Sequence, residues 1–152
     1  MKRHIAYVVA IVAASLTLTG PARAQQTNPE MQYYVIGEKY PKGLSDFQAF
    51  GLFRKAAGGK ARYDGWVMSN LEDPDGSVVD MASVRVEGKK LAFRTKPKKS
   101  ISFAFDGVFL KSGDFKRWIH SDTAVVEGRV RKLRGGRTVA EGTIRFHCGA
   151  GG

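Results

Sequence analysis

The sequence predicts a mainly β fold, a small antiparallel up-and-down β-barrel or a strongly curled sheet, with one short N-terminal α-helix. From Tyr63 onward, apolar and polar residues alternate and turn residues recur at short intervals, which indicates a series of short strands. Four strands carry an inner-face glycine directly after an outer-face acidic residue: Asp64-Gly65, Asp106-Gly107, Glu127-Gly128 and Glu141-Gly142. Because inward glycines let a sheet bend sharply, their recurrence predicts that the sheet closes on itself.

The N-terminus is typical of a secretory signal peptide. Lys2 and Arg3 precede an apolar run over residues 5–18, and small residues end at Ala24. The run is too short for a membrane-spanning helix, which needs about 20 apolar residues. We therefore expect residues 1–24 to be removed and the remaining chain to be periplasmic or secreted, without a membrane span.

The chain expected after cleavage is long enough for one domain with a modest core. The complete sequence holds 25 Lys and Arg against 14 Asp and Glu, and the leader contains three of the basic residues, which leaves a net charge of +8. This excess favours an anionic envelope component or an acidic protein as partner over nucleic acid, which an exported protein seldom meets. A positive charge that serves only solubility explains it equally well.

Residues 25–62 are expected to form an N-terminal segment that packs with the rest of the chain as one domain. The stretch MQYYVIGEKY, residues 31–40, is a possible first strand. Ser45 can cap a helix over residues 45–57, because two phenylalanines follow it three residues apart and two glycines end the pattern. This helix would cover the apolar outer face of the strands that follow.

Six further strands are predicted within residues 63–148, and residues 149–152 read as a flexible, glycine-rich tail. Short turn-rich segments separate the strands, so each is expected to pair with its neighbour. The general architecture is similar to that of calycins such as the lipocalins. The resemblance concerns architecture alone, because the G-x-W motif of the first lipocalin strand is replaced here by adjacent Gly65 and Trp66.

Turn lengths also predict the register of the sheet. A five-residue loop after the third of these strands sets Phe93 opposite Phe103. A three-residue loop in the last hairpin sets Gly128 opposite Gly142 on the inner face. The same hairpin is expected to form an outer ion pair between one arginine and one glutamate, Arg129 and Glu141.

The predicted inner face is rich in phenylalanine. The candidate ligand contacts on it are Phe93, Phe103, Phe105 and Phe109. In a wide barrel, these rings beside glycines would line a dry pocket for a small hydrophobic or amphipathic molecule. In a narrow barrel, they would simply fill the core.

The longest irregular stretch of the β region, residues 111–123, is a candidate binding loop at the barrel mouth. It offers Trp118 as an apolar contact, with Lys116 and Arg117 beside it for an acidic headgroup. A short helix that packs Trp118 against the barrel is an equally good interpretation.

Two groups of basic residues are candidate contacts for an anionic surface. The last hairpin carries Arg129, Arg131, Lys132, Arg134 and Arg137, and the loop before the fourth strand of the meander carries Lys96, Lys98 and Lys99. These cations could bind phosphate or carboxylate groups. Ordinary solvated strand and loop positions explain them as well, because charge runs are weakly specific.

The sequence offers few residues that could serve in catalysis or in metal binding. The chain expected after cleavage has two histidines, His120 and His147, and lacks a nucleophile elbow. The stretch EDPDGSVVD, residues 72–80, is better explained as a hairpin turn than as a calcium loop. The single cysteine, Cys148, could pair with another chain or stay a free thiol. We expect no catalytic residue, no metal and no cofactor.

Two hypotheses on function follow. The first is an exported, non-catalytic binding protein that holds a small apolar or amphipathic ligand in its barrel. The alternative is a basic interaction protein, an inhibitor or envelope adaptor, whose core is packed and whose surface binds an acidic protein, lipid or polymer.

Overall fold

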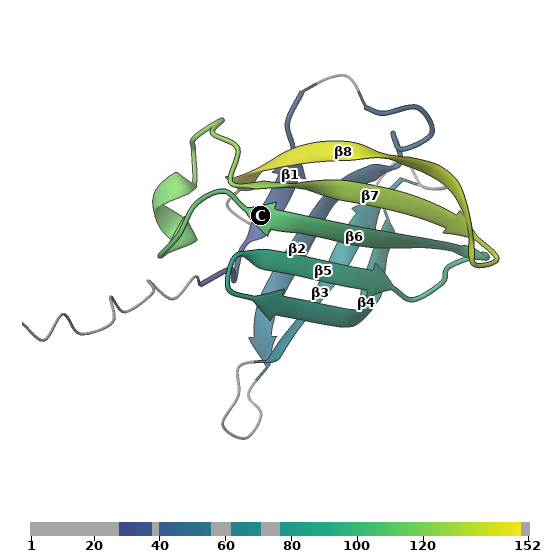
Figure 1. The fold of residues 1–152 in the computed structure, drawn as a ribbon, viewed down its shortest axis with the longest axis horizontal. Helices are drawn as coiled ribbons and strands as arrows, with labels where there is room; N and C mark the ends of the chain where they lie inside the picture. Colours follow the sequence, from purple (N-terminus) through teal and green to yellow (C-terminus); the bar gives the residue numbers. More distant parts are fainter. Residues whose placement is uncertain (1–27, 38–39, 56–61, 71–76, 150–152) are drawn as a thin grey trace, which may run out of the picture.

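The computed structural model describes residues 28–37, 40–55, 62–70 and 77–149. Eight antiparallel strands follow one another around a closed barrel, and β1 pairs with β8 to complete it (Figure 1). The strands are β1 Gln32–Val35, β2 Phe47–Lys55, β3 Arg62–Ser69, β4 Ser77–Glu87, β5 Lys90–Thr95, β6 Ile101–Phe109, β7 Val126–Arg134 and β8 Arg137–Gly149. The mainly β, antiparallel barrel predicted from the alternation and the glycines is confirmed.

The helix predicted over residues 45–57 is wrong, because β2 occupies Phe47–Lys55 and pairs with both β1 and β3. The register between β2 and β3 shifts between Phe47 and Ala49, as in a β-bulge. One extra residue there puts Phe47 and Phe50 together in the core at a spacing of three. This spacing imitates the period of a helix.

Part of the outer face of β2 and β3 is covered without a helix. A Cβ atom placed on Gly51 of β2 would lie only 2.6 Å from an indole carbon of Trp66, so the Trp66 ring lies directly over that glycine. Gly51 and Trp66 are also opposite each other in the register. The helix was expected to cover an apolar outer face with Trp66, Met68, Val79 and Met81. The structure instead places Val79 and Met81 in the core, after a register shift between Met81 and Ser83 of β4, and sets Trp66 over Gly51.

The register between β5 and β6 differs from the prediction by two residues, because Phe93 lies opposite Phe105 and not Phe103. Lys98 and Ile101 exchange two backbone hydrogen bonds across a separate tight turn, whose two central residues have positive φ. This turn was not foreseen in the five-residue loop. A shift of two residues leaves every side chain on its predicted face.

The last hairpin is also shifted by two residues. Its loop is the pair Gly135-Gly136, both with positive φ, as a tight two-residue turn requires. A further irregularity lies at Lys132 and Leu133. As a result, Gly128 lies opposite Ile144 on β8 rather than the predicted Gly142, and opposite Gly107 on β6.

Aromatic rings fill the barrel interior. Tyr33 stacks on Phe50 with ring centroids 4.7 Å apart, and Phe50 also lies edge-on to Phe146 at 5.0 Å. Phe93 stacks on Phe105 at 5.1 Å. Each of these rings is at most 2% exposed, so the core is one continuous aromatic cluster.

Segments outside the strands contribute buried side chains at both ends of the barrel. Leu44, just before β2, is fully buried and lies close to the space beside Gly142 of β8. At the other end, the 3₁₀ turn η1, Phe115–Trp118, places the fully buried Phe115 against Phe109 of β6 with ring centroids 5.3 Å apart. Figure 1 shows η1 at the end of the barrel opposite the β7–β8 turn.

Candidate functional site

The four inward phenylalanines singled out in the sequence all lie in the core. They are Phe93, Phe103, Phe105 and Phe109, and none is more than 2% exposed. Each has a neighbouring ring within about van der Waals contact, for example Phe103 against Phe47 at 5.2 Å between centroids. The structure therefore brings these residues together as mutual packing partners.

The linker after β6 separates its aromatic and charged side chains. Phe115 enters the core, whereas Lys116 and Arg117 are exposed. Trp118 is half-buried against the core, and the Lys111 ammonium lies 4.9 Å from the centroid of its ring. Trp118 thus has a cation beside it, but that cation is Lys111 rather than either residue named from the sequence.

Most of the outer arginines on β7 and β8 are paired with carboxylates. The ion pairs are Arg129 with Glu141, Arg131 with Asp106, and Arg145 with Glu127. The first of them is the pair predicted from the sequence. These pairs cross from strand to strand on the outer face, so the charge of this part of the hairpin is largely neutralised within the protein.

Lys132 does not lie on the outer surface with the arginines around it. It lies opposite the core-packed Ala140, and its ammonium forms a 2.5 Å ion pair with Asp46. Only 18% of the Lys132 side chain and 13% of the Asp46 side chain are exposed. Sequence reasoning missed Asp46, because no local pattern indicates a pair between the segment before β2 and β7.

The remaining basic residues gather at one end of the barrel. The backbone N–H of Gly135, in the β7–β8 turn, donates a 3.0 Å hydrogen bond to the carbonyl of Ser100 in the β5–β6 loop. Figure 1 shows both connections at the same end of the barrel. We call the exposed cations of these two connections the basic end: Lys98, Lys99, Arg134 and Arg137. The two basic groups found separately in the sequence therefore form one surface.

The basic end and the outer face of β7 and β8 differ in how many of their cations have carboxylate partners. Lys98, Arg134 and Arg137 have no carboxylate partner within the described ranges of the chain. Lys96, at the start of the same loop, is paired with Asp80 at 3.1 Å. The cations without a carboxylate partner are therefore the ones available to an external anion.

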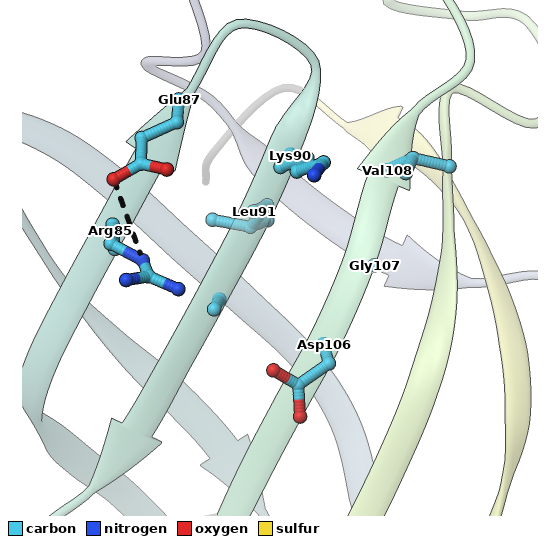
Figure 2. Close-up of a pocket in the computed structure, with 8 residues that line it drawn as sticks. Arg85, Glu87, Lys90, Leu91, Asp106, Gly107 and Val108 are labelled. Carbon is cyan, nitrogen blue, oxygen red and sulfur yellow. Dashed lines mark ion pairs between the residues drawn. The ribbon is translucent and has the colours of Figure 1, made fainter.

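A shallow groove follows β5 on the outer face of the barrel (Figure 2). It consists of two adjoining depressions of about 320 and 370 Å³, which share Arg85, Ala92 and Asp106 as lining residues. We call this the β5 groove. Its charged lining residues are Arg85, Glu87, Lys90, Arg94, Asp106 and Arg131.

Alternation in the sequence could have identified part of this groove. Leu91 and Phe93 of β5 are buried, so Lys90 and Arg94 belong to the outward positions of the same strand. Arg85 reaches the groove from β4, opposite Ala92. The position of Arg85 beside Ala92 depends on how β4 pairs with β5, which alternation along one strand does not show.

The thiol of Cys148 lies in the core, opposite Tyr33 of β1, and the residue is 1% exposed. Burial raises the pKa of the thiol to about 12. Burial also raises the pKa of Tyr33 far above its usual value, and its hydroxyl donates a 2.8 Å hydrogen bond to the carbonyl of Pro29. In the folded chain Cys148 is thus a packing residue.

We expect Cys148 to resist thiol reagents at pH 8 while the protein is folded. Few thiolates exist at that pH when the pKa is about 12, and the sulfur is covered. Labelling by a maleimide, followed by mass spectrometry, should be slower than in urea by roughly two orders of magnitude. Equally fast labelling of the native and denatured chains would contradict the buried position.

Several sequence predictions concern residues that the structure does not describe. The signal peptide over residues 1–24 and most of the calcium-like stretch, residues 72–76, lie outside the described residues. Within the described part, no three His, Cys, Asp or Glu side chains gather as metal ligands. No helix of that part is long and apolar enough to cross a bilayer. The expected lack of catalysis, metal and cofactor remains a prediction.

Neither a protein-family model, nor a curated protein, nor a solved structure matches this chain.

Proposed function

We propose that this protein is an exported, basic interaction protein with a packed core, and that it binds an anionic partner through the basic end. The observation that carries the proposal is the contrast in charge pairing. Along the outer face of β7 and β8, Arg129, Arg131 and Arg145 have carboxylate partners. At the end of the barrel, Lys98, Arg134 and Arg137 have none within the described residues.

The packed interior supports this proposal over a ligand held inside the barrel. The inward rings contact one another, and side chains from beyond the strands are buried at each end of the barrel. An interior pocket for an apolar molecule would require several of these rings to move apart, at a cost in packing. The outer surface needs no such rearrangement.

We infer a calycin-like general architecture from the up-and-down arrangement of eight strands, and this likeness concerns the fold alone. Related folds serve many functions, so the architecture does not decide between an interior ligand and a surface partner. Export rests on the leader sequence.

Reversing two charges at the basic end should weaken binding to a polyanion. We expect Lys98→Glu with Arg134→Glu to bind immobilised poly-glutamate about tenfold more weakly at low salt, since each exposed cation contributes up to about 1 kcal/mol. The difference should shrink as salt is added, because exposed charges are screened. Retention can be measured by biolayer interferometry on the purified chain.

The matched control is Lys116→Glu with Arg117→Glu, which changes the net charge equally at the opposite end of the barrel. It should reduce binding much less. Equal losses in both variants would mean that net charge alone acts, and would contradict the proposal. A small apolar molecule retained in native mass spectrometry of the protein from its own host would favour the interior ligand instead.

A further inference from the structure

We propose that the β5 groove binds an extended acidic segment of a partner protein, with carboxylates at alternate positions. This inference rests on the proposed function, because it names the class of anionic partner. It adds a second contact surface, on the side of the barrel, to the basic end.

Small side chains lie at the base of the groove, and charged side chains line its sides. Ala92 of β5 and Ala104 of β6 lie at its base, where small side chains leave room above the sheet. Figure 2 shows Arg85 and Glu87 on one side of the strand that carries Lys90 and Leu91, and Asp106 on the other side. The depression therefore runs along a strand.

The charges in the groove favour an anion. Lys90 and Arg94 have no carboxylate partner within the described ranges. Arg85 is 3.7 Å from Glu87, and both side chains are mostly exposed, so this pair is weak. Of the two acidic residues in the groove, Asp106 is already paired with Arg131. An incoming carboxylate would therefore meet cations that the protein leaves available.

The spacing of these cations fits an extended peptide. Outward positions on a strand recur every two residues, about 6.6 to 6.8 Å apart, and an extended peptide repeats its own side chains at the same distance. Lys90 and Arg94 are two repeats apart on β5, and Arg85 lies beside the position between them. Carboxylates on alternate residues of a peptide would face these three cations in turn.

The position of the groove favours a peptide over a membrane surface. The groove is concave and lies on the side of the barrel, where a flat bilayer in contact with the basic end would not enter it. β5 leads into the loop that carries Lys98. An acidic segment bound along β5 can therefore continue to the basic end without a turn.

Two synthetic peptides of identical composition test this inference. In one, glutamate alternates with serine, and in the other all glutamates are contiguous. We expect the alternating peptide to bind the unmodified chain about fivefold more tightly, as two or three weak exposed ion pairs would give. Fluorescence anisotropy of labelled peptides at low salt measures the ratio.

Filling the groove without changing charge should remove this preference. Ala92→Phe places a ring on the groove floor, whereas Val139→Phe makes a similar change at an exposed position of β8 outside the groove. The first variant should bind both peptides equally, and the second should keep the ratio. Lys90→Gln with Arg94→Gln should also reduce the ratio towards one, while Arg54→Gln with Arg62→Gln should not.

The outcomes separate this inference from the proposed function. If both peptides bind equally to the unmodified chain, and Lys98→Glu with Arg134→Glu weakens both, the groove proposal is overturned and the basic end stands. Binding to vesicles of anionic lipid without binding to either peptide would also overturn the groove proposal alone. If neither poly-glutamate, peptides nor vesicles bind, both proposals fail.

Discussion

Gly128→Val is expected to lower the melting temperature by roughly 6 to 15 °C, for a loss of about 2 to 3 kcal/mol. Gly128 lies opposite Gly107, and the ring of Phe105 lies over both glycines. A Cβ atom on Gly128 would be 2.6 Å from the Gly107 Cα and 2.6 Å from a carbon of that ring. The backbone contact cannot be relieved by a rotamer change, so the two strands must move apart.

Differential scanning calorimetry measures this loss, with Thr143→Val as the control. Thr143 is exposed on the neighbouring strand, so its replacement should change the melting temperature little. A double-mutant cycle of Gly128→Ala and Phe105→Leu should show favourable coupling, because the smaller side chain makes room for the methyl group. Strict additivity, or a tolerated Gly128→Val, would contradict the close contact.

Asp46→Ala is expected to destabilise the fold by about 2 to 4 kcal/mol, because it leaves the mostly buried Lys132 ammonium without its partner. The Arg129–Glu141 pair is more exposed, at 59% and 43%, so Glu141→Gln should cost less than about 1 kcal/mol. Urea unfolding followed by tryptophan fluorescence measures both losses.

Replacing both Asp46 and Lys132 distinguishes the effect of an unpaired buried charge from the effect of lost packing. In Asp46→Ala with Lys132→Met, no buried charge remains unpaired, so much of the lost stability should return. If the double variant is as unstable as the sum of the single variants, Lys132 and Asp46 do not interact as described. A loss for Asp46→Ala no larger than that for Glu141→Gln would contradict the buried pair directly.

The failed helix shows how one local irregularity can mislead a pattern. The spacing between Phe47 and Phe50 is equally compatible with a helix and with a strand that contains a bulge. Gly51 within the segment disfavours a helix. A glycine stands there because it makes room for the ring of Trp66 on the neighbouring strand, which is a contact of the folded structure. A pattern along the chain alone could not distinguish the two.

The register errors have a similar cause. For β5 to β8 the sequence indicates which face each side chain takes, and both errors shift the pairing by two residues without changing a face. In β4 the register shift between Met81 and Ser83 places Val79 and Met81 in the core, whereas the sequence predicts them on the outer face. The turn at Lys98–Ile101 and the irregularity at Lys132 depend on how the neighbouring strands fit together. Counting loop residues does not reveal them.

Some residues of the candidate sites can be recognised from the sequence, whereas others depend on the folded structure. The outward Lys90 and Arg94 can be recognised from the alternation along β5, and the cations of the last hairpin can be read directly from the sequence. The pairing of Arg131 with Asp106 and the inward position of Lys132 depend on the folded barrel. These partners decide which cations remain available to an anion.

The sequence by itself determined the mainly β class, the alternation of inner and outer faces, the inward glycines and the excess of basic charge. The first three properties follow from the two-residue period of a strand, and the excess of charge follows from composition. None of them depends on contacts between residues that lie far apart along the chain. Only the tertiary structure decided that β1 and β2 complete the barrel, that aromatic rings fill it, and that two distant loops form one basic end. The physical reason is that ring packing, bulges and charge pairing are set by neighbours across the sheet, which lie far apart along the chain.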